Sequence, residues 1–234
     1  MNRSLPDLPA KVPTTADGTV VFSALAAAYT AFGLTFRGPR ARFWQRMTLT
    51  GLALGSLAIA ADRDLRRLKL RVRDVALGLV AAGGLYVVFQ VGDRLARRIM
   101  PRGAEEIGEV YALRSLRPRP ELAARLALVI GPAEELFWRG FLQRRLGRGD
   151  RWRGAALASA AYGGAHLAAA NPTLVGAAVM AGGFWSVLAA AGVSIPALIV
   201  SHVAWDVWIF LVAPTGPKRS PGSMNLAGTG KASS

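Results

Sequence analysis

The longest uncharged stretch of this chain runs from Gly154 to Trp205 and contains no Asp, Glu, Lys or Arg. In water, a segment of this length would need protein cover on every side, whereas in a bilayer it can form helices that face lipid. The whole composition agrees with a bilayer. Of the 234 residues 52% are hydrophobic and only 18% are charged, where soluble domains carry about a quarter. The stretch therefore predicts a membrane-embedded, all-α protein.

Two sequence breaks divide this stretch into helices of spanning length. Asn171-Pro172 is the first, because proline suits a first helical turn and disfavours helix in the residue before it. The second covers residues 192–196 and contains Ser194, a candidate N-cap. We therefore predict three spanning helices, near residues 154–170, 173–191 and 195–212.

Four further apolar segments precede these three along the chain. They cover residues 19–36, 47–61, 75–92 and 121–142. Together the segments predict an all-α, polytopic transmembrane helix bundle of about seven spans, within a range of roughly six to eight. We divide the chain into a disordered N-terminal tail, three accessory helices, a polar interfacial linker, a transmembrane core and a disordered C-terminal tail, at residues 1–18, 19–92, 93–120, 121–212 and 213–234.

The net charge of +15 comes almost entirely from arginine. These arginines lie between the apolar segments and not on a recognition helix, so we interpret them as loop charges that contact lipid headgroups, with no nucleic-acid partner. The basic loops at 62–74 and 143–153 fall on one side of an alternating bundle, which the positive-inside rule assigns to the cytoplasm. The arginine- and alanine-rich composition indicates a GC-rich genome, and hence a bacterial plasma membrane.

Two glutamates and an arginine interrupt the fourth apolar segment. Ionised side chains inside a bilayer are costly, so they usually face a bundle interior and serve a function. Glu135 and Arg139 lie four residues apart with the glutamate first, which predicts an ion pair on one helix face. Glu134 falls on another face, which it shares with Trp138. The segment therefore offers one neutralised carboxylate and one spare carboxylate in a poorly solvated place, which suits a general base.

Two later segments carry the remaining polar groups of the predicted bundle interior. Tyr162 and His166 lie in the fifth predicted span, four residues apart and so on one helix face. His202 and Asp206 are spaced in the same way in the last span. The chain has no histidine besides these two. We therefore expect these side chains to converge with Glu134 in the membrane interior.

Such a set of side chains supports the activation of water. Glu134 can accept a proton from a water molecule that His166 holds. His202, oriented by Asp206, can donate a hydrogen bond to the oxyanion that develops on a substrate carbonyl. The same four side chains are also acceptable ligands for a divalent metal such as zinc, which would polarise the water or the carbonyl instead. Spacing alone leaves both mechanisms open.

Three motifs, in order along the chain, resemble those of one membrane family. Glu134-Glu135-Leu136-Phe137-Trp138-Arg139 looks like the EExxxR motif of the CPBP (CAAX protease and bacteriocin-processing, or Abi) intramembrane endopeptidases. Tyr162-Gly163-Gly164-Ala165-His166 resembles their FxxxH motif, and His202-Val203-Ala204-Trp205-Asp206 resembles HxxxN or HxxxD. The resemblance covers residues 121–212, which makes this core the catalytic one.

The resemblance implies an endopeptidase that cleaves near the C-terminus of a membrane-associated substrate, as in CAAX processing of prenylated proteins. It assigns Glu134 and His166 to water activation, His202 and Asp206 to the oxyanion site, and supporting roles to Glu135, Arg139, Tyr162 and Trp138. Asp206 stands where the CAAX enzymes carry Asn, so we expect it to orient His202, to stay protonated or to bind metal. Bacteria generally lack prenylated CAAX proteins, which favours another membrane-embedded or lipid-anchored peptide or protein as substrate.

Other classes of function fit the same residues less well. A silent membrane scaffold or self-immunity protein of the family would bind a partner, but it has no need to keep charged groups that are costly in lipid. A transporter with a proton relay is disfavoured because the chain lacks internal repeats and paired broken helices. The sequence has no HExxH motif, no Gly-x-Ser-x-Gly motif and no cysteine, which argues against the zincin, serine and cysteine classes.

Overall fold

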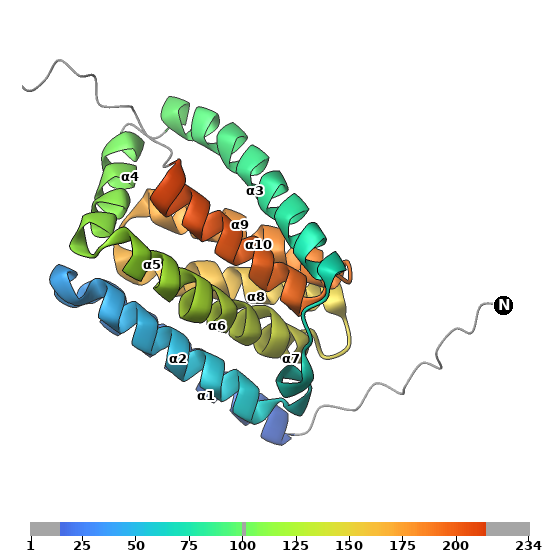
Figure 1. Ribbon diagram of the computed structural model, residues 1–234. Helices are drawn as coiled ribbons and strands as arrows, with labels where there is room; N and C mark the ends of the chain where they lie inside the picture. The colour runs from blue at the N-terminus through green and yellow to red at the C-terminus, as the bar shows by residue number, and fades with distance from the viewer. Residues whose placement is uncertain (1–14, 100–101, 214–234) are drawn as a thin grey trace, which may run out of the picture.

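The computed structural model describes residues 15–99 and 102–213, and all regular structure in these ranges is helical. The α-helices (Figure 1) are α1 (Thr15–Arg37), α2 (Phe43–Ala61), α3 (Val72–Ile99), α4 (Gly103–Ala112), α5 (Arg119–Arg125), α6 (Gly131–Glu135), α7 (Arg144–Gly147), α8 (Arg151–His166), α9 (Pro172–Ala190) and α10 (Ile195–Val207). Turns of 3-10 helix are η1 (Arg40–Arg42), η2 (Arg63–Arg67), η3 (Leu113–Leu116) and η6 (Leu167–Ala169). Stretches of π-helix are η4 (Leu126–Ile130), η5 (Leu136–Gln143) and η7 (Trp208–Val212). The all-α prediction is confirmed here; of the predicted tails, residues 1–14 and 214–234 lie outside the described residues.

Four of the described helices are long and apolar enough to cross a membrane: Gly18–Arg37, Val72–Arg94, Pro172–Ala190 and Ile195–Val212. They coincide with four of the predicted spans and mark the chain as an integral membrane protein. The other predicted spans, at 47–61, 121–142 and 154–170, do not combine the same length and hydropathy. The reasons are that α2 carries Gln45 and Arg46 in its first turn, the motif segment carries internal charges, and α8 has only 16 residues.

Side-chain caps begin the last three helices, and the last two start at the points that the sequence indicated. The Asp150 carboxylate accepts from two backbone N–H groups at the start of α8. Asn171 accepts from the N–H of Leu174 to begin α9, and Ser194 accepts from the N–H of Ala197 to begin α10. Because each side chain satisfies a backbone donor that the helix itself leaves free, these starts are fixed locally. The two predicted breaks are confirmed.

The bundle is arranged around one long helical path at its centre. α5, η4, α6, η5 and α7 follow one another with right-handed helical backbone at every junction from Arg125 to Arg144. Figure 1 shows this path between α2 on one side and α10 on the other, with α1 behind α2 and α3 along the outside of α10. α8 and α9 pack against each other and complete the bundle. The path carries the acidic motif, so the motif lies at the centre of the fold.

The central path changes helical type where the motif begins and ends. π-helical turns of η4 end at Ile130, the α-helical turn of α6 holds Glu134 and Glu135, and η5 returns to π geometry at Leu136. Wide turns of this kind are frequent at functional sites. The two glutamates therefore lie on a short α-helical turn between two wider segments.

α3 lies very close to α10 because a glycine faces it. A Cβ atom placed on Gly78 would lie 2.6 Å from the carbonyl oxygen of Ala197 and 2.6 Å from the Cβ of Val200. Only a residue without a side chain allows this approach, as is common between helices in lipid. The Ser194 hydroxyl donates to Asp74 Oδ1 at 2.6 Å and joins the same two helices one turn away.

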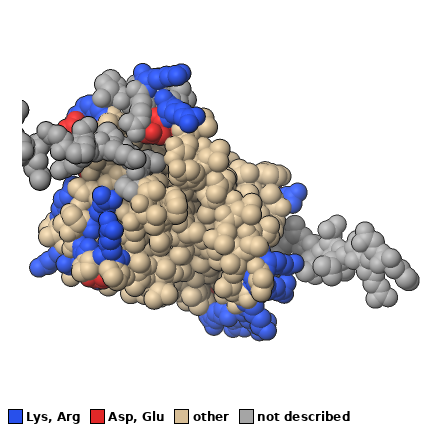
Figure 2. Space-filling model, turned by 45° about the horizontal axis from the view of Figure 1, so that its top comes forward, with Lys and Arg blue, Asp and Glu red and all other residues tan. Residues whose placement is uncertain are grey.

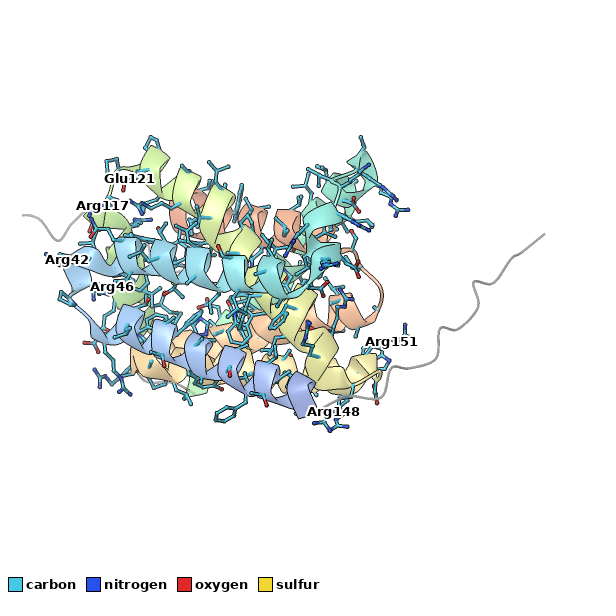
Figure 3. The ribbon with its side chains drawn as sticks, turned by 90° about the horizontal axis from the view of Figure 1, so that it is seen from below. Arg42, Arg46, Arg117, Glu121, Arg148 and Arg151 are labelled. Carbon is cyan, nitrogen blue, oxygen red and sulfur yellow. The ribbon has the colours of Figure 1, made fainter. Side chains whose placement is uncertain are left out.

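Charged side chains gather at the two ends of the bundle. Figure 2 shows lysines and arginines on opposite sides of a broad uncharged surface, and Figure 3 places Arg42 and Arg117 at one end and Arg148 and Arg151 at the other. The loops at 62–74 and 143–153 meet at the second of these ends, since Arg144 lies 3.4 Å from Asp62. Their predicted common side is thereby confirmed.

The segment 93–120, predicted as a polar interfacial linker, contains α4 at its middle. α3 extends to Ile99, beyond the predicted end of its span, and α4 runs across the end of the bundle in Figure 1. Trp44 Nε1 donates to the carbonyl of Leu113, and Arg40 donates to that of Glu109, so α2 and the chain before it hold this segment in place.

Candidate active site

A cavity of about 600 Å³ lies inside the bundle, and side chains from all three motifs line it. The motif side chains at its wall are Glu134, Tyr162, His166, His202 and Asp206. Most of the remaining wall is apolar and aromatic, and includes Phe36, Trp44, Phe89, Leu126, Met180, Trp185, Trp205 and Phe210. The convergence expected from the sequence is therefore present in the structure.

Glu134 is held by a tyrosine from the neighbouring helix. Its carboxylate is buried, and the Tyr162 hydroxyl donates to Oε2 at 2.8 Å. Trp138, which is fully buried, packs edge-on against the Tyr162 ring at a centroid distance of 5.3 Å. The tyrosine is thus clamped between an indole and the carboxylate, and this fixes one oxygen of Glu134 in a single position.

His166 is oriented by the same tyrosine, through its backbone. Nδ1 lies 2.8 Å from the carbonyl oxygen of Tyr162, and because a carbonyl can only accept, Nδ1 carries the hydrogen. In the neutral ring Nε2 then holds the free lone pair. The rings of Phe32 and Phe36 lie 5.1 and 5.6 Å from the imidazole and restrict its rotation.

His202 lies between two carboxylates and on top of an indole. Its Nδ1 is 2.7 Å from Glu135 Oε1, and its Nε2 is 3.6 Å from Asp206 Oδ2. The ring stacks on Trp185 with centroids 4.0 Å apart and planes 19° apart. Trp185 is in turn fixed by its Nε1, which donates to the Ser201 hydroxyl at 3.1 Å.

The residue that orients His202 differs from the expectation. The sequence assigned this task to Asp206, which shares a helix face with the histidine. The structure gives the short contact to Glu135, from the central path, while Asp206 lies beyond hydrogen-bond length on the other side of the ring. The physical reason is tertiary, since α10 packs against α6 and brings His202 onto the motif turn.

The Glu135–Arg139 ion pair predicted from the four-residue spacing is confirmed. The two side chains are fully buried, and Arg139 Nη1 donates to Glu135 Oε1 at 2.8 Å. Arg139 Nη2 also donates to the carbonyl of Gly182 on α9 at 3.0 Å, and the guanidinium lies 4.9 Å from the centre of the Tyr162 ring. One oxygen of Glu135 therefore accepts from both Arg139 and His202.

Sequence reasoning missed three residues that support this site. Trp185 and Ser201 lie in apolar segments, and nothing in their spacing distinguishes them from ordinary packing residues. Gln143 had a signal, because it continues the four-residue series of Glu135 and Arg139. It is buried, and its Nε2 donates to the carbonyl of Ser186 at 2.9 Å.

The side chains do not form a ready metal site. Within residues 15–99 and 102–213, no three His, Cys, Asp or Glu side chains come together as a ligand group. Glu134 Oε2 already accepts from Tyr162, and His202 faces a carboxylate on each side. The four predicted ligands thus do not fit zinc in this arrangement, and we derive no step through a metal.

The comparisons with known proteins agree with the motifs. Residues 120–208 match the family model described as type II CAAX prenyl endopeptidase Rce1-like. The matched segment begins in α5 and ends in η7, and it includes all three motifs. A search of the curated proteins and a search of the solved structures found no match. The family resemblance stated from the sequence is confirmed for this segment.

Proposed function

Starting from membership of residues 120–208 in the Rce1-like endopeptidase family, we propose that this protein is an intramembrane endopeptidase. It hydrolyses a peptide bond in a membrane-associated protein or peptide, with water activated by Glu134 and His166. The observation that carries the proposal is the grouping of a buried carboxylate and two buried histidines at one cavity wall in the bundle.

Glu134 is the general base in this proposal. Tyr162 occupies Oε2, so we assign Oε1 to the water molecule. The carboxylate takes one proton from the water, and the water oxygen forms a bond to the carbonyl carbon of the substrate. His166 accepts a hydrogen bond from the same water through Nε2, the nitrogen that the Tyr162 carbonyl leaves free. The water molecule is thereby oriented toward the carbonyl carbon as well as deprotonated.

His202 stabilises the charge that forms on the substrate oxygen. Two carboxylates, from Glu135 and Asp206, flank its ring and favour the doubly protonated imidazolium, which has an N–H on each nitrogen. The Nδ1–H is held by Glu135, and the Nε2–H can donate to the oxyanion. When the C–N bond breaks, Glu134 passes its proton to the leaving amine, which yields a carboxylic acid and an amine.

The apolar wall of the cavity supports a substrate that comes from the membrane. Aromatic and aliphatic side chains from several helices surround the polar groups, which suits an apolar peptide segment or a lipid-anchored one. We further propose that the bundle crosses the membrane about seven times. The loops at 62–74 and 143–153 would then face the cytoplasm of a bacterial plasma membrane.

The test is cleavage of a membrane-peptide library by purified protein, wild type beside Glu134→Gln. Loss of the general base should lower the rate by about a thousandfold, within the usual contribution of acid–base catalysis. Glu121→Gln is the matched control, because Glu121 lies on the same helical path but pairs with Arg125 at a half-exposed site. Equal cleavage by Glu134→Gln and wild type would contradict the proposal.

Two further results would separate the alternatives. Activity that survives a chelator supports water activation by the side chains alone, whereas loss that zinc restores would assign a metal to the site. If wild type cleaves no peptide but Glu134→Gln still binds the wild type's cellular partner, the protein is a scaffold or self-immunity protein instead.

A further inference from the structure

A ladder of polar side chains crosses the apolar bundle behind the site. Glu135, Arg139 and Gln143 follow one another at four-residue spacing along the central path. α9 faces them with two backbone carbonyls, also four residues apart: Arg139 donates to Gly182 and Gln143 donates to Ser186. We call these residues the polar ladder. It begins at Glu135, which contacts His202, and ends at Gln143, where the basic segment 143–153 begins.

Four side chains of the polar ladder each keep one hydrogen-bonding atom that has no partner among the described residues. These atoms are Glu135 Oε2, Arg139 Nε, Gln143 Oε1 and Ser186 Oγ, and all four side chains are at least nine-tenths buried. Buried polar atoms nearly always find a partner, either protein or ordered water. The set mixes a pure donor, two pure acceptors and a hydroxyl, and water is the small ligand that serves all three kinds.

A second cavity opens beside the far end of the polar ladder. It has a volume of about 450 Å³, and its polar lining residues include Arg139, Gln143, Arg144, Asp150 and Arg151. Arg151 lies at the loop end of the bundle (Figure 3). This second cavity shares no lining residue with the first, which holds the motif side chains.

Glu135 lines neither cavity, but its contacts link a residue in the wall of each. Arg139 lines the second cavity and His202 lines the first, and the same oxygen of Glu135 accepts from both. The first cavity is mostly apolar, so an apolar substrate seated there would close it to water. A hydrolase whose substrate closes the cavity in this way needs another route by which the attacking water molecule can reach the site.

We propose that the second cavity and the polar ladder hold a file of ordered water molecules, and that water reaches the site by this route from the loop end of the bundle. The role in supplying water rests on the proposed hydrolysis, whereas the water file itself does not. The water sites are set by Arg139 Nε, Gln143 Oε1 and Ser186 Oγ, with Glu135 Oε2 at the inner end.

The first test is an experimental structure of the wild-type protein at a resolution that shows ordered water. We expect water density within hydrogen-bond distance of Gln143 Oε1, Ser186 Oγ and Arg139 Nε. A map that shows water at the bundle surface but none on the polar ladder would overturn the proposal. This result decides the water file even if wild type cleaves no peptide, in which case only the proposed function fails.

The second test compares two identical substitutions on α9. Ala189 lines the second cavity and Ala177 lines the first, and both are partly buried. Ala189→Leu should lower kcat by about tenfold with KM unchanged, because it narrows the water route and leaves the substrate cavity intact. Ala177→Leu should raise KM instead. A wild-type kcat for folded Ala189→Leu would contradict the supply role.

Discussion

Glu135 joins three parts of the site from one buried position. Its Oε1 accepts from Arg139 of the same helical path and from His202 of α10. Charge-assisted bonds of this kind are short and strong, and removal of one partner leaves a charge in a place without water. The second glutamate of the motif therefore ties the buried ion pair to His202.

We predict that Arg139→Met destabilises the protein by about 3 kcal/mol, because a buried carboxylate loses its partner and the Gly182 carbonyl loses its donor. Thermal unfolding in detergent would measure the change. Arg102→Gln is the control: its pair with Glu105 has side chains 73% and 65% exposed and should contribute less than about 1 kcal/mol. Equal melting temperatures for the two variants would show that the buried pair is not structural.

At the residue scale, contacts set by local helical spacing could be predicted from the sequence. Contacts set by long-range packing could not. The Glu135–Arg139 pair follows from one helical turn, and the shared faces of Tyr162 with His166 and of His202 with Asp206 were predicted in the same way. The contact between Glu135 and His202 joins residues 67 positions apart. No sequence periodicity encodes that contact. The sequence therefore predicted that Asp206, which is nearer to His202 along the chain, orients the ring.

α3 and α10 pack so closely that a single methyl group should separate them. We predict that Gly78→Ala destabilises the protein by about 1–3 kcal/mol, since its Cβ would meet the Ala197 carbonyl, which is backbone and cannot turn away. Gly83→Ala on the same helix has no heavy atom within 4 Å of its new Cβ and should be neutral or slightly stabilising. Melting curves of both variants test this, and a stable Gly78→Ala would refute it.

α4 is joined to α9 by a carboxylate that titrates outside the membrane spans. Glu106 accepts from the hydroxyl and the backbone N–H of Thr173, at 2.6 and 3.0 Å, and these bonds, with the charge of Arg102, hold its pKa below the ordinary value of 4.5. Because the pKa of Glu106 is lowered in the folded state, the contribution of its ionised carboxylate to the stability of the fold is complete above pH 4.5. It is lost as the pH falls from there through the folded pKa.

We predict that the difference in melting temperature between wild type and Glu106→Gln is largest at neutral pH and shrinks below pH 4.5. The measurement is a series of melting curves between neutral pH and about pH 3, a range that covers the titration of an ordinary glutamate. Glu109→Gln, an exposed position on the same helix, should match wild type throughout. A difference that stays constant with pH would argue against titration of Glu106 at this joint.

The starts of the helices were readable in the sequence, but their inner geometry was not. Asn171, Ser194 and the prolines mark helix starts through local chemistry, so the breaks before α9 and α10 were predicted correctly. The π-helical turns on both sides of Glu134 leave no such mark. They depend on how the central path meets α2 and α10, which only the assembled bundle decides.

At the scale of the molecule, an apolar body carries arginines at both ends. We predict that anionic lipid raises the melting temperature relative to zwitterionic lipid, because each arginine near the surface gains about 1 kcal/mol from the negative headgroups. Melting in nanodiscs of the two compositions measures this, and added salt should reduce the difference. The exposed pair Arg148 and Arg151 offers a check, since the double change to Gln should lower the gain. No dependence on lipid charge would count against headgroup contact.

The number of membrane crossings shows where composition alone is a weak guide. α1, α3, α9 and α10 meet the length and hydropathy of a span, and they were predicted within a few residues. The central path fails the same criterion because it carries the buried charges of the site. The chemistry that makes this segment functional also makes it a poor match to a generic membrane helix.

Tyr162 holds both partners of the proposed water-activating pair, Glu134 through its hydroxyl and His166 through its carbonyl. A sliding or tilting motion of α8 would therefore move the two anchoring atoms together and shift both partners in the same direction. The relative position of the Glu134 carboxylate and the His166 ring is then insensitive to small thermal displacements of the helix. A site built from separate helices in a fluid bilayer gains mechanical tolerance from this single shared residue.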